Sequence, residues 1–384
     1  MFNFAKQRLQ NLGYAVHKNN TKIYWQRYFT KKSNIAIFSI FLAILLIGLI
    51  CLLVIKNSPI NSIDNNSIYV NDLPPIFNQV ITRNFERGAQ LDFIRNIADQ
   101  ETKRASELGI NLSFYIIFDS ARDVGGSLTV NTDIVTLIYN PYHLIEAINN
   151  LNPDNQIIIN HLPLLGTNAN GVDIYARIWS SVFLTLTILL IAIFINMFMG
   201  FSFAALYSFN SNKWYAIVID KIATMFISIP EIIWIFLLCI FAGTNWYGVL
   251  ISFILIGWFY FYEASKQEIK NVKSFEFIIA AKAIGLSQTQ IIYRHVFKRI
   301  LPSLLILLVD RLTINILIVS SLAFLDFITN ANNLNIGTIL KEAIYATKSN
   351  PWYLAIISTY LTGFSIMLKL FSLSLATTLN PWIN

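Results

Sequence analysis

Residues 276–305 read EFIIAAKAIGLSQTQIIYRHVFKRILPSLL, a charged and alanine-rich stretch within a chain that is otherwise mostly apolar. Glu276 lies in the first turn of a predicted helix that Ser274 can cap, and Gly285 can end that helix in the left-handed conformation that suits glycine. Ser287 opens an S-x-x-Q capping box, which indicates a second helix directly afterwards. The stretch is therefore predicted to form a helix, a sharp turn and a helix.

The composition around this stretch is that of a membrane protein. The 384 residues are 55% hydrophobic and 13% charged, with a mean hydropathy of +0.56, which is too apolar for a soluble globular protein. We predict an all-α polytopic membrane protein with six transmembrane helices, because six runs can cross a hydrocarbon layer of about 30 Å. These runs are Asn34–Ile55, Ile178–Tyr207, Tyr215–Ala242, Trp246–Tyr262, Pro302–Leu325 and Trp352–Ala376. The two cysteines lie in apolar runs and offer no disulfide framework or metal site.

The distribution of basic residues predicts the orientation. Segment 1–33 carries lysine and arginine without any acid, and the loop 263–301 is also rich in lysine and arginine, as cytoplasmic segments are. The first apolar run, 34–55, ends without a small-x-small cleavage site, so we expect an uncleaved anchor. Six crossings then leave both termini and the loop 263–301 in the cytoplasm of a multi-pass cell-membrane protein.

Between the first and second runs lies a segment large enough to fold by itself. Residues 56–165 are predicted to form an α/β extracytoplasmic domain inserted between helices 1 and 2, because acids outnumber lysine and arginine over 56–177. Apolar periodicity and β-branched runs predict two helices and two strands in it. These are Gln90–Leu108 and Tyr142–Leu151 for the helices, and Leu112–Phe118 and Ile134–Tyr139 for the strands. Residues 166–384 are predicted to hold the other five transmembrane helices.

The first helix of the opening stretch has one narrow face with small residues at its centre. Phe277, Ala280, Ala281 and Ile284 share this face, and small residues allow another backbone to approach closely. Two interpretations follow from the spacing. The helix rests on lipid headgroups as an amphipathic interfacial segment, or it inserts into a groove on a cytoplasmic partner.

Further residues in this stretch favour the second interpretation. One series resembles the EAA loop of ABC importer permeases, the coupling helix that docks into a cleft of the ATPase subunit. Its members are Glu276, Ala280, Ala281, Ala283, Gly285, Ile291, Ile292, Arg294 and His295. The predicted ATPase-coupling residues are Glu276, Phe277, Ala280, Ala281, Ala283, Gly285, Ile291, Arg294 and His295.

The resemblance extends along the chain. The sequence HLPLLGTNANGVDIYAR at 161–177 is similar to a signature of the C-type permease subunit of dipeptide and oligopeptide importers. It supplies a predicted external gate motif, namely Gly166, Thr167, Gly171, Asp173 and Arg177. SSLAFLDF at 320–327, Asn350–Pro351–Trp352 and LNPW at 379–382 follow in the order of that family.

This resemblance implies the transmembrane subunit of an ATP-driven importer that forms half of a pathway for oligopeptides or dipeptides. Expected partners are a homologous second permease subunit, two ABC ATPase subunits that bind ATP and Mg²⁺, an extracytoplasmic binding protein and membrane lipid, with no nucleic acid. The chain itself is expected to bind no cofactor or metal and to catalyse no reaction, because Walker-type, H-E-x-x-H and G-x-S-x-G motifs are missing from the sequence. The alternatives are a permease for nickel or another oligopeptide-like solute, and a membrane-anchored sensor or assembly factor that works through its external domain.

Ionisable side chains inside predicted spans are costly and therefore become functional candidates. Glu231 follows Pro230 in the middle of the third predicted span, and Pro230, Glu231 and Trp234 are predicted to line the substrate pathway. The alternatives for Glu231 are a structural ion pair or a position nearer the membrane surface. Four other charged residues lie nearer the cytoplasmic ends of spans and are predicted to extend toward the interface. They are Lys221, Asp310, Arg311 and Lys369.

Overall fold

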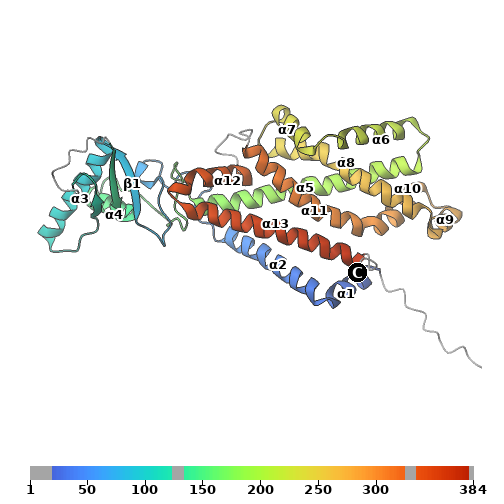
Figure 1. The fold of residues 1–384 in the computed structure, drawn as a ribbon, viewed down its shortest axis with the longest axis horizontal. Helices are drawn as coiled ribbons and strands as arrows, with labels where there is room; N and C mark the ends of the chain where they lie inside the picture. The colour runs from blue at the N-terminus through green and yellow to red at the C-terminus, as the bar shows by residue number, and fades with distance from the viewer. Residues whose placement is uncertain (1–19, 123–133, 325–333, 380–384) are drawn as a thin grey trace, which may run out of the picture.

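The computed structural model describes residues 20–122, 134–324 and 334–379, and it has an elongated shape (Figure 1). Within these ranges five helical segments are long and apolar enough to cross a membrane. They are α2 (Lys32–Leu53), α5 (Ile174–Phe209), α8 (Trp246–Lys273), the run Gln288–Ala323 that leads into α11 (Phe297–Phe324), and α13 (Pro351–Leu379). The bent pair α6 (Trp214–Ile227) and α7 (Glu231–Ala242) passes the same test when taken together.

The third predicted span is not continuous. Helices α6 and α7 meet at an angle of 99°, whereas the sequence predicts one helix over Tyr215–Ala242. Pro230 stands at the break, where its ring disfavours a helical conformation for Ile229 and where it has no N–H to donate. Glu231 is consequently the first residue of α7, directly after the break.

The centre of the bundle is the pair α5 and α8, which glycine allows to approach closely. A Cβ atom on Gly200 would lie 2.6 Å from the Cβ of Phe261 and 2.7 Å from the carbonyl oxygen of Trp258. Asn196 donates from Nδ2 to the carbonyl oxygen of Phe253 at 2.9 Å. Close backbone contact and a buried side-chain hydrogen bond are the features that hold helices together in lipid, where no hydrophobic driving force acts between them.

Residues between α2 and α5 build a separate unit at one end of the bundle (Figure 1). Strands β1 (Ile81–Glu86), β2 (Ile116–Asp119) and β3 (Ile134–Tyr139) form an antiparallel sheet in the order β1-β3-β2. Helices α3 (Ala89–Leu108) and α4 (Pro141–Leu151) complete a core of its own with the sheet. Both helices and β3 lie where the sequence predicts them; β2 is shorter than predicted, and β1 was not predicted.

Two buried carboxylates stabilise this α/β unit. Arg95 makes two hydrogen bonds of 2.8 Å to the carboxylate of Asp119, and Arg104 pairs with Glu101 at 2.8 Å. Burial alone would raise the pKa of Asp119, but the hydrogen bonds from Arg95 and from the Ala121 amide outweigh it and hold that pKa below its usual value. The hydrogen bond from Arg104 likewise lowers the pKa of Glu101.

Shorter helices lie at the two ends of the bundle. At the end away from the sheet are α1 (Asn20–Thr30), α9 (Glu276–Ala283), α10 (Gln288–Gln290) and the π-helical turn η2 (Ile291–Val296) (Figure 1). At the sheet end lie α12 (Ile336–Tyr345), η1 (Ile68–Val70) and η3 (Ala346–Lys348). The predicted basic segment before Asn20, the end of SSLAFLDF from Leu325 and the closing residues 380–382 lie outside the described residues.

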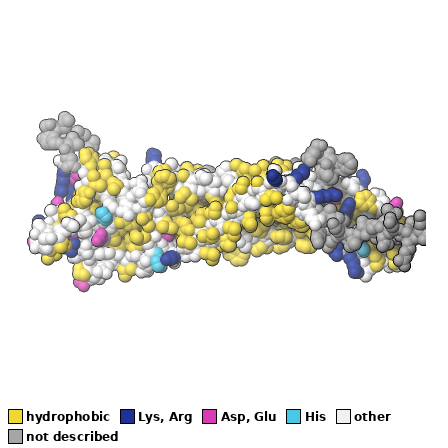
Figure 2. All heavy atoms as spheres, turned by 90° about the horizontal axis from the view of Figure 1, so that it is seen from below, with side chains coloured by type: hydrophobic (Ala, Val, Ile, Leu, Met, Phe, Trp, Pro, Cys, Tyr) yellow, Lys and Arg dark blue, Asp and Glu magenta, His cyan; other side chains and the backbone are white. Residues whose placement is uncertain are grey.

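The outer surface divides into an apolar middle and two polar ends. Figure 2 shows apolar side chains over the middle of the molecule, and Lys and Arg side chains gathered at the end that carries α9. Helix α2 lies on the outside of the bundle, since Asn34 and Gly48 are its buried residues. A multi-pass membrane protein has this surface, because the apolar middle matches the hydrocarbon layer.

Candidate functional site

The turn that ends α9 has the geometry expected of a glycine-terminated helix. Gly285 has a φ of +85°, and its N–H donates to the carbonyl oxygen of Lys282 at 3.0 Å. The N–H of Leu286 donates to the carbonyl oxygen of Ala281 at 3.2 Å, which completes a Schellman motif. Glycine is favoured at this position because a Cβ atom is strained at positive φ. The left-handed conformation predicted for Gly285 is present.

The second predicted helix also begins as the sequence indicates. Ser287 accepts a hydrogen bond from the Gln290 N–H, and the Gln290 side chain accepts one from the Ser287 N–H at 3.0 Å, so the capping box is formed. The helix then passes through η2 and continues into α11 without a break. One short turn therefore joins α9 to a helix that spans the bundle.

The predicted cap of α9 is wrong. Phe275 is the N-cap residue and makes no side-chain capping bond. The Ser274 hydroxyl donates to the carbonyl oxygen of Asn271 at 3.0 Å, because Ser274 still belongs to the C-terminal end of α8. Glu276 stands in the first turn, as expected, and is exposed.

The predicted face of α9 also needs correction. Ala281 is 6% exposed and packs, with Ile278, against the rest of this chain, so it does not belong to an outward stripe with Ala280. The outward face instead carries Ile279, which is 61% exposed, and Ile284, which is 79% exposed. Ala280 and Ala283 lie on the same exposed side, whereas the side chain of Phe277 is outside the described part of the structure.

The segment after the turn is anchored to α5. Ile291 is buried, and the Tyr293 hydroxyl lies 3.0 Å from the hydroxyl of Ser202 on α5. Phe201 of α5 contacts the ring of Tyr293, with ring centroids 5.8 Å apart. Arg294 is exposed and His295 is half-buried, so η2 presents basic side chains outward while its apolar residues hold it to the bundle.

Two charged residues predicted to have different roles form one buried pair. Arg311 of α11 donates from Nη2 to Glu231 Oε2 at the start of α7, and both side chains are largely buried. The guanidinium carbon also lies 3.9 Å from the ring centroid of Tyr260 on α8. The prediction that Arg311 extends toward the interface is therefore wrong, because an attractive partner is available inside the bundle.

Other predicted residues near this pair have separate surroundings. Pro230 and Lys221 are exposed, and Trp234 donates from Nε1 to the carbonyl oxygen of Phe226 at 3.2 Å. Asp310, the neighbour of Arg311, pairs with Lys369 of α13. Neither Asp310 nor Lys369 reaches the Glu231 cluster in the described contacts.

At the opposite end, the predicted gate motif surrounds the start of α5. Asp173 caps α5 through the Tyr175 N–H at 2.8 Å and accepts from Asn57 at 2.7 Å. Arg177 is 2% exposed and binds the Glu342 carboxylate of α12 through Nε at 2.8 Å. These contacts join α5, α12 and the chain that leads into the α/β unit.

The glycines and the threonine of the motif fix the same junction. Gly166 and Gly171 have φ values of +79° and +72°. A Cβ on Gly166 would lie 2.0 Å from the carbonyl oxygen of Leu73, so the chain there admits only glycine without movement. The hydroxyl of Thr167 accepts from the Leu73 N–H at 2.8 Å and donates to the carbonyl oxygen of Val70.

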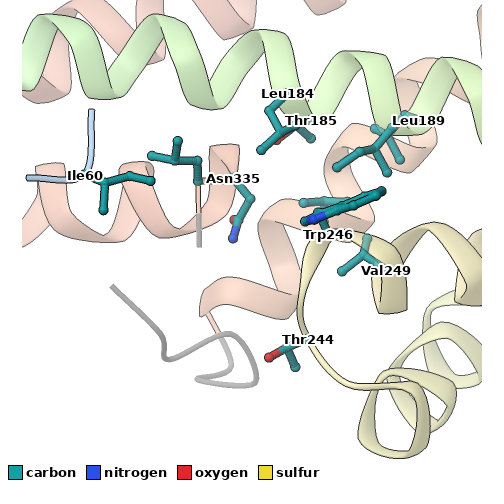
Figure 3. A pocket seen from close by; sticks show the side chains of 11 residues that line it. Ile60, Leu184, Thr185, Leu189, Thr244, Trp246, Val249 and Asn335 are labelled. Carbon is teal, nitrogen blue, oxygen red and sulfur yellow. The ribbon is translucent and has the colours of Figure 1, made fainter. Parts of the chain in front are cut away.

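Figure 3 shows a pocket near this junction, between α5, the start of α8 and the residues before α12. Its volume is about 190 Å³ and its walls are mainly apolar, with the Trp246 ring on one side and Thr185 and Asn335 contributing polar atoms. The Thr185 hydroxyl is engaged with the Ile336 N–H at 3.1 Å. Among the described residues, no group of three or more His, Cys, Asp or Glu side chains is placed to hold a metal ion.

A known protein family matches the part of the chain that holds α9, its turn and the buried ion pair. Residues 196–377 match the family described as binding-protein-dependent transport system inner membrane component. This match covers 182 of the 384 residues. The matched residues include α9 with its turn, the Glu231–Arg311 pair and α12, and they exclude the α/β unit.

Individual relatives are named as transport permease proteins, and two of those described below are named for peptides. The oligopeptide transport system permease protein OppC of Bacillus subtilis is 20% identical over 49% of this chain and 62% of that protein. The inner membrane ABC transporter permease protein YejE of Escherichia coli is 28% identical over 49% of this chain and 54% of that protein. The dipeptide transport system permease protein DppC of Alkalihalophilus pseudofirmus is 23% identical over 63% of this chain and 78% of that protein.

The chain spans between half and two thirds of the length of the first two relatives. A solved structure of the methionine ABC transporter MetNI in inward-facing conformations aligns with 52% of this chain and 96% of that chain, with 17% identity and a TM-score of 0.38.

Two features of residues 196–377 were not predicted from the sequence. The spacing of residues along α9 shows which side chains share a face of the helix, but not whether that face points toward the bundle or toward solvent, and Ala281 was therefore placed outward. The pairing of Glu231 with Arg311 joins residues 80 positions apart. The sequence did contain an indication of this pair, because a carboxylate buried in a membrane needs an opposite charge and Arg311 is a basic residue within a predicted span.

Proposed function

We propose that this chain is the transmembrane subunit of an ATP-driven ABC importer and forms half of a translocation pathway for oligopeptides or dipeptides. The observation that carries the proposal is the outward face of α9, which presents Ile279 and Ile284 to solvent at the end of the bundle rich in lysine and arginine. Exposed apolar side chains on a short helix favour insertion into a groove of a partner. The names of the relatives support peptides as the solute.

In this proposal α9 is the coupling helix and the ATPase subunit is its partner. ATP binding closes the two ATPase subunits and moves α9, and the turn at Gly285 passes the movement through η2 to α11 and α5. The bundle then changes between inward-open and outward-open states. Transport requires only that the affinity of the bundle for the solute differs between these two states. ATP and Mg²⁺ belong to the partner subunits, and this chain acts as the transport component.

The proposed topology has six spans, with α6 and α7 together forming the third. Both termini and α9 are cytoplasmic, in line with the basic end of the molecule, and residues 56–165 are extracytoplasmic. The α/β unit then enlarges the docking surface for an extracytoplasmic binding protein, while a homologous second permease subunit completes the pathway. The residues around Gly166 and Arg177 form the external gate, since they join α5 and α12 to that unit.

A charge placed on the outward face of α9 tests the proposal. Ile284→Glu changes a side chain that is 79% exposed, so we expect normal insertion but loss of copurifying ATPase subunits and of ATP-dependent peptide uptake in vesicles. Leu108→Glu is the matched control for ATPase copurification, because it makes the same kind of change at a side chain that is 62% exposed on the α/β unit, away from α9. Normal ATPase copurification and uptake with Ile284→Glu would contradict the proposal.

A further inference from the structure

A cavity of about 260 Å³ lies between α8 and α11 in the half of the bundle nearer α9. Its lining is partly polar, with Gln267, Glu268 and Asn271 from α8 and Ser303 from α11. Ala264 and Leu307 line it as well. Gln267 and Asn271 are exposed, so the cavity opens toward the end of the bundle that carries α9.

The inner end of the cavity meets the buried ion pair. Tyr260 precedes Ala264 by one helical turn on α8, and Arg311 follows Leu307 by one turn on α11, a rise of about 6 Å in each case. Because the two helices run in opposite directions, both residues lie beyond the same end of the cavity (Figure 1). The contact between the Arg311 guanidinium and the Tyr260 ring, at 3.9 Å, closes that end.

Glu231 completes the closed end and is only partly satisfied. One carboxylate oxygen, Oε2, accepts from Arg311. The other, Oε1, is buried and has no hydrogen-bond partner among the described residues. Glu231 is 6% exposed, so Oε1 is shielded from water and has no hydrogen-bond donor in the described part of the chain. A buried acceptor without a donor raises the free energy of the folded protein, and a ligand that donates a hydrogen bond to Oε1 would remove this penalty.

The charges around Oε1 indicate the kind of ligand. An ammonium group can donate a hydrogen bond to a carboxylate oxygen that, like Oε1 in the described structure, has no other donor. Arg311 already balances the charge of Glu231, however, so an amine alone would add an uncompensated positive charge in a buried place. A solute with both an ammonium and a carboxylate adds no net charge, since the ammonium faces Glu231 and the carboxylate faces Arg311.

We infer that Glu231, Arg311 and Tyr260 form a binding site for the free amino and carboxyl ends of a short zwitterionic solute at the inner end of this cavity. The inference rests on the proposed function and assigns a recognition step to the permease chain itself. Glu231 Oε1 accepts from the ammonium group, and Arg311, which lies over the face of Tyr260, donates to the carboxylate.

Protection of a cysteine in the cavity tests this site in the assembled importer. Ala264→Cys is introduced after Cys51 and Cys239 have been replaced by alanine, and its modification by a small thiol reagent is followed in inside-out vesicles. We expect a dipeptide to slow the modification at least tenfold, and its N-acetylated form and a C-terminal amide to give little protection. Glu231→Gln should remove the protection by the dipeptide, while modification without dipeptide stays unchanged and shows that the cavity is intact.

Two further variants separate recognition from folding. Asp310→Asn is the matched control, because Asp310 is adjacent to Arg311 in sequence and pairs with Lys369 instead, so protection should persist. Tyr260→Leu leaves the ion pair in place and should weaken protection even if Glu231→Gln fails to insert. Equal protection by free and blocked dipeptides, or no protection by the dipeptide, would overturn the inference. ATP-dependent uptake, measured in vesicles of the same preparation, separates the failure of this site from the failure of the proposed function. Intact uptake without protection rejects the site alone, whereas absence of uptake rejects the proposed function.

Discussion

The role of the Gly285 turn in coupling can be tested by replacing this glycine with valine. Valine at this position must adopt a φ near +85°, where a Cβ atom costs about 1–2 kcal/mol. A Cβ built on Gly285 has no neighbour within 4 Å, so the whole cost is backbone strain and none is a clash with the bundle. A cost of this size shifts the equilibrium between the Schellman turn and other turns by a factor of about 5–30.

The expected result is an importer that assembles in the membrane but transports poorly. Gly285→Val turns α9 away from its position while the long helices keep every one of their contacts, so the amount of inserted protein should be normal and ATP-dependent uptake should fall severalfold. Gly285→Asn should retain more uptake, because asparagine tolerates the left-handed region better than valine does.

Gly109→Val supplies the control for strain itself. Gly109 ends α3 with a φ of +64°, and its Cβ would also meet nothing within 4 Å, so the same substitution strains a helix end in the α/β unit. Uptake per inserted molecule is measured for all variants in one vesicle preparation. Uptake near the wild-type value with Gly285→Val, or an equal loss with Gly109→Val, would refute the role of this turn in coupling.

Three other expectations concern topology, packing and pH. A cysteine at the exposed Asn155 should react with an impermeant thiol reagent in whole cells and one at the exposed Gln288 should not; the reverse labelling would invert the topology. Gly200→Ala should destabilise the α5–α8 contact by about 1–3 kcal/mol in thermal unfolding, whereas Gly363→Ala, where a Cβ meets nothing within 4 Å, should not. Because the pKa of Asp119 is lowered by folding, its contribution is complete above the unfolded value of about 4 and is lost as pH falls through the folded value. Hydrogen exchange of the α/β unit in the full chain, corrected for intrinsic rates, should therefore rise only below about pH 4, and a rise at pH 6 would contradict this.

Sequence patterns located the membrane helices well, because a span must be apolar over about 20 residues whatever it packs against. The same patterns missed the break in the third span, although Pro230 marked its place. Proline tells where a helix is interrupted, but the angle of 99° depends on how α6 and α7 pack on α8, which is a long-range property. Strand β1 was missed for a similar reason, since ITRNFE carries too few apolar residues to stand out and is held by pairing with β3.

At the candidate site, the turn at Gly285 and the capping box at Ser287 were predicted correctly, whereas the Ser274 cap and the direction of α9 were not. Gly285 and the capping box at Ser287 depend on neighbours within a few residues, so the sequence contained all of the information needed for them. The direction of α9 depends on which of its faces meets the bundle, and the spacing of Ala280 and Ala281 is compatible with either. Ile278 and Ala281 are buried and Ile279 is exposed, and η2, which follows α9, is held against α5.

The most direct test of the account is a cross-linking scan of α9 in the assembled importer. Single cysteines at Ala280, Ala281 and Ala283 are paired with cysteines along the cleft of the copurified ATPase subunit, and cross-linked product is measured per inserted molecule. Cross-links from Ala280→Cys and Ala283→Cys, with little or none from Ala281→Cys, are the result expected if the exposed face of α9 docks on the ATPase. Efficient cross-linking from Ala281→Cys without Ala280→Cys, or none from any of the three, would contradict it.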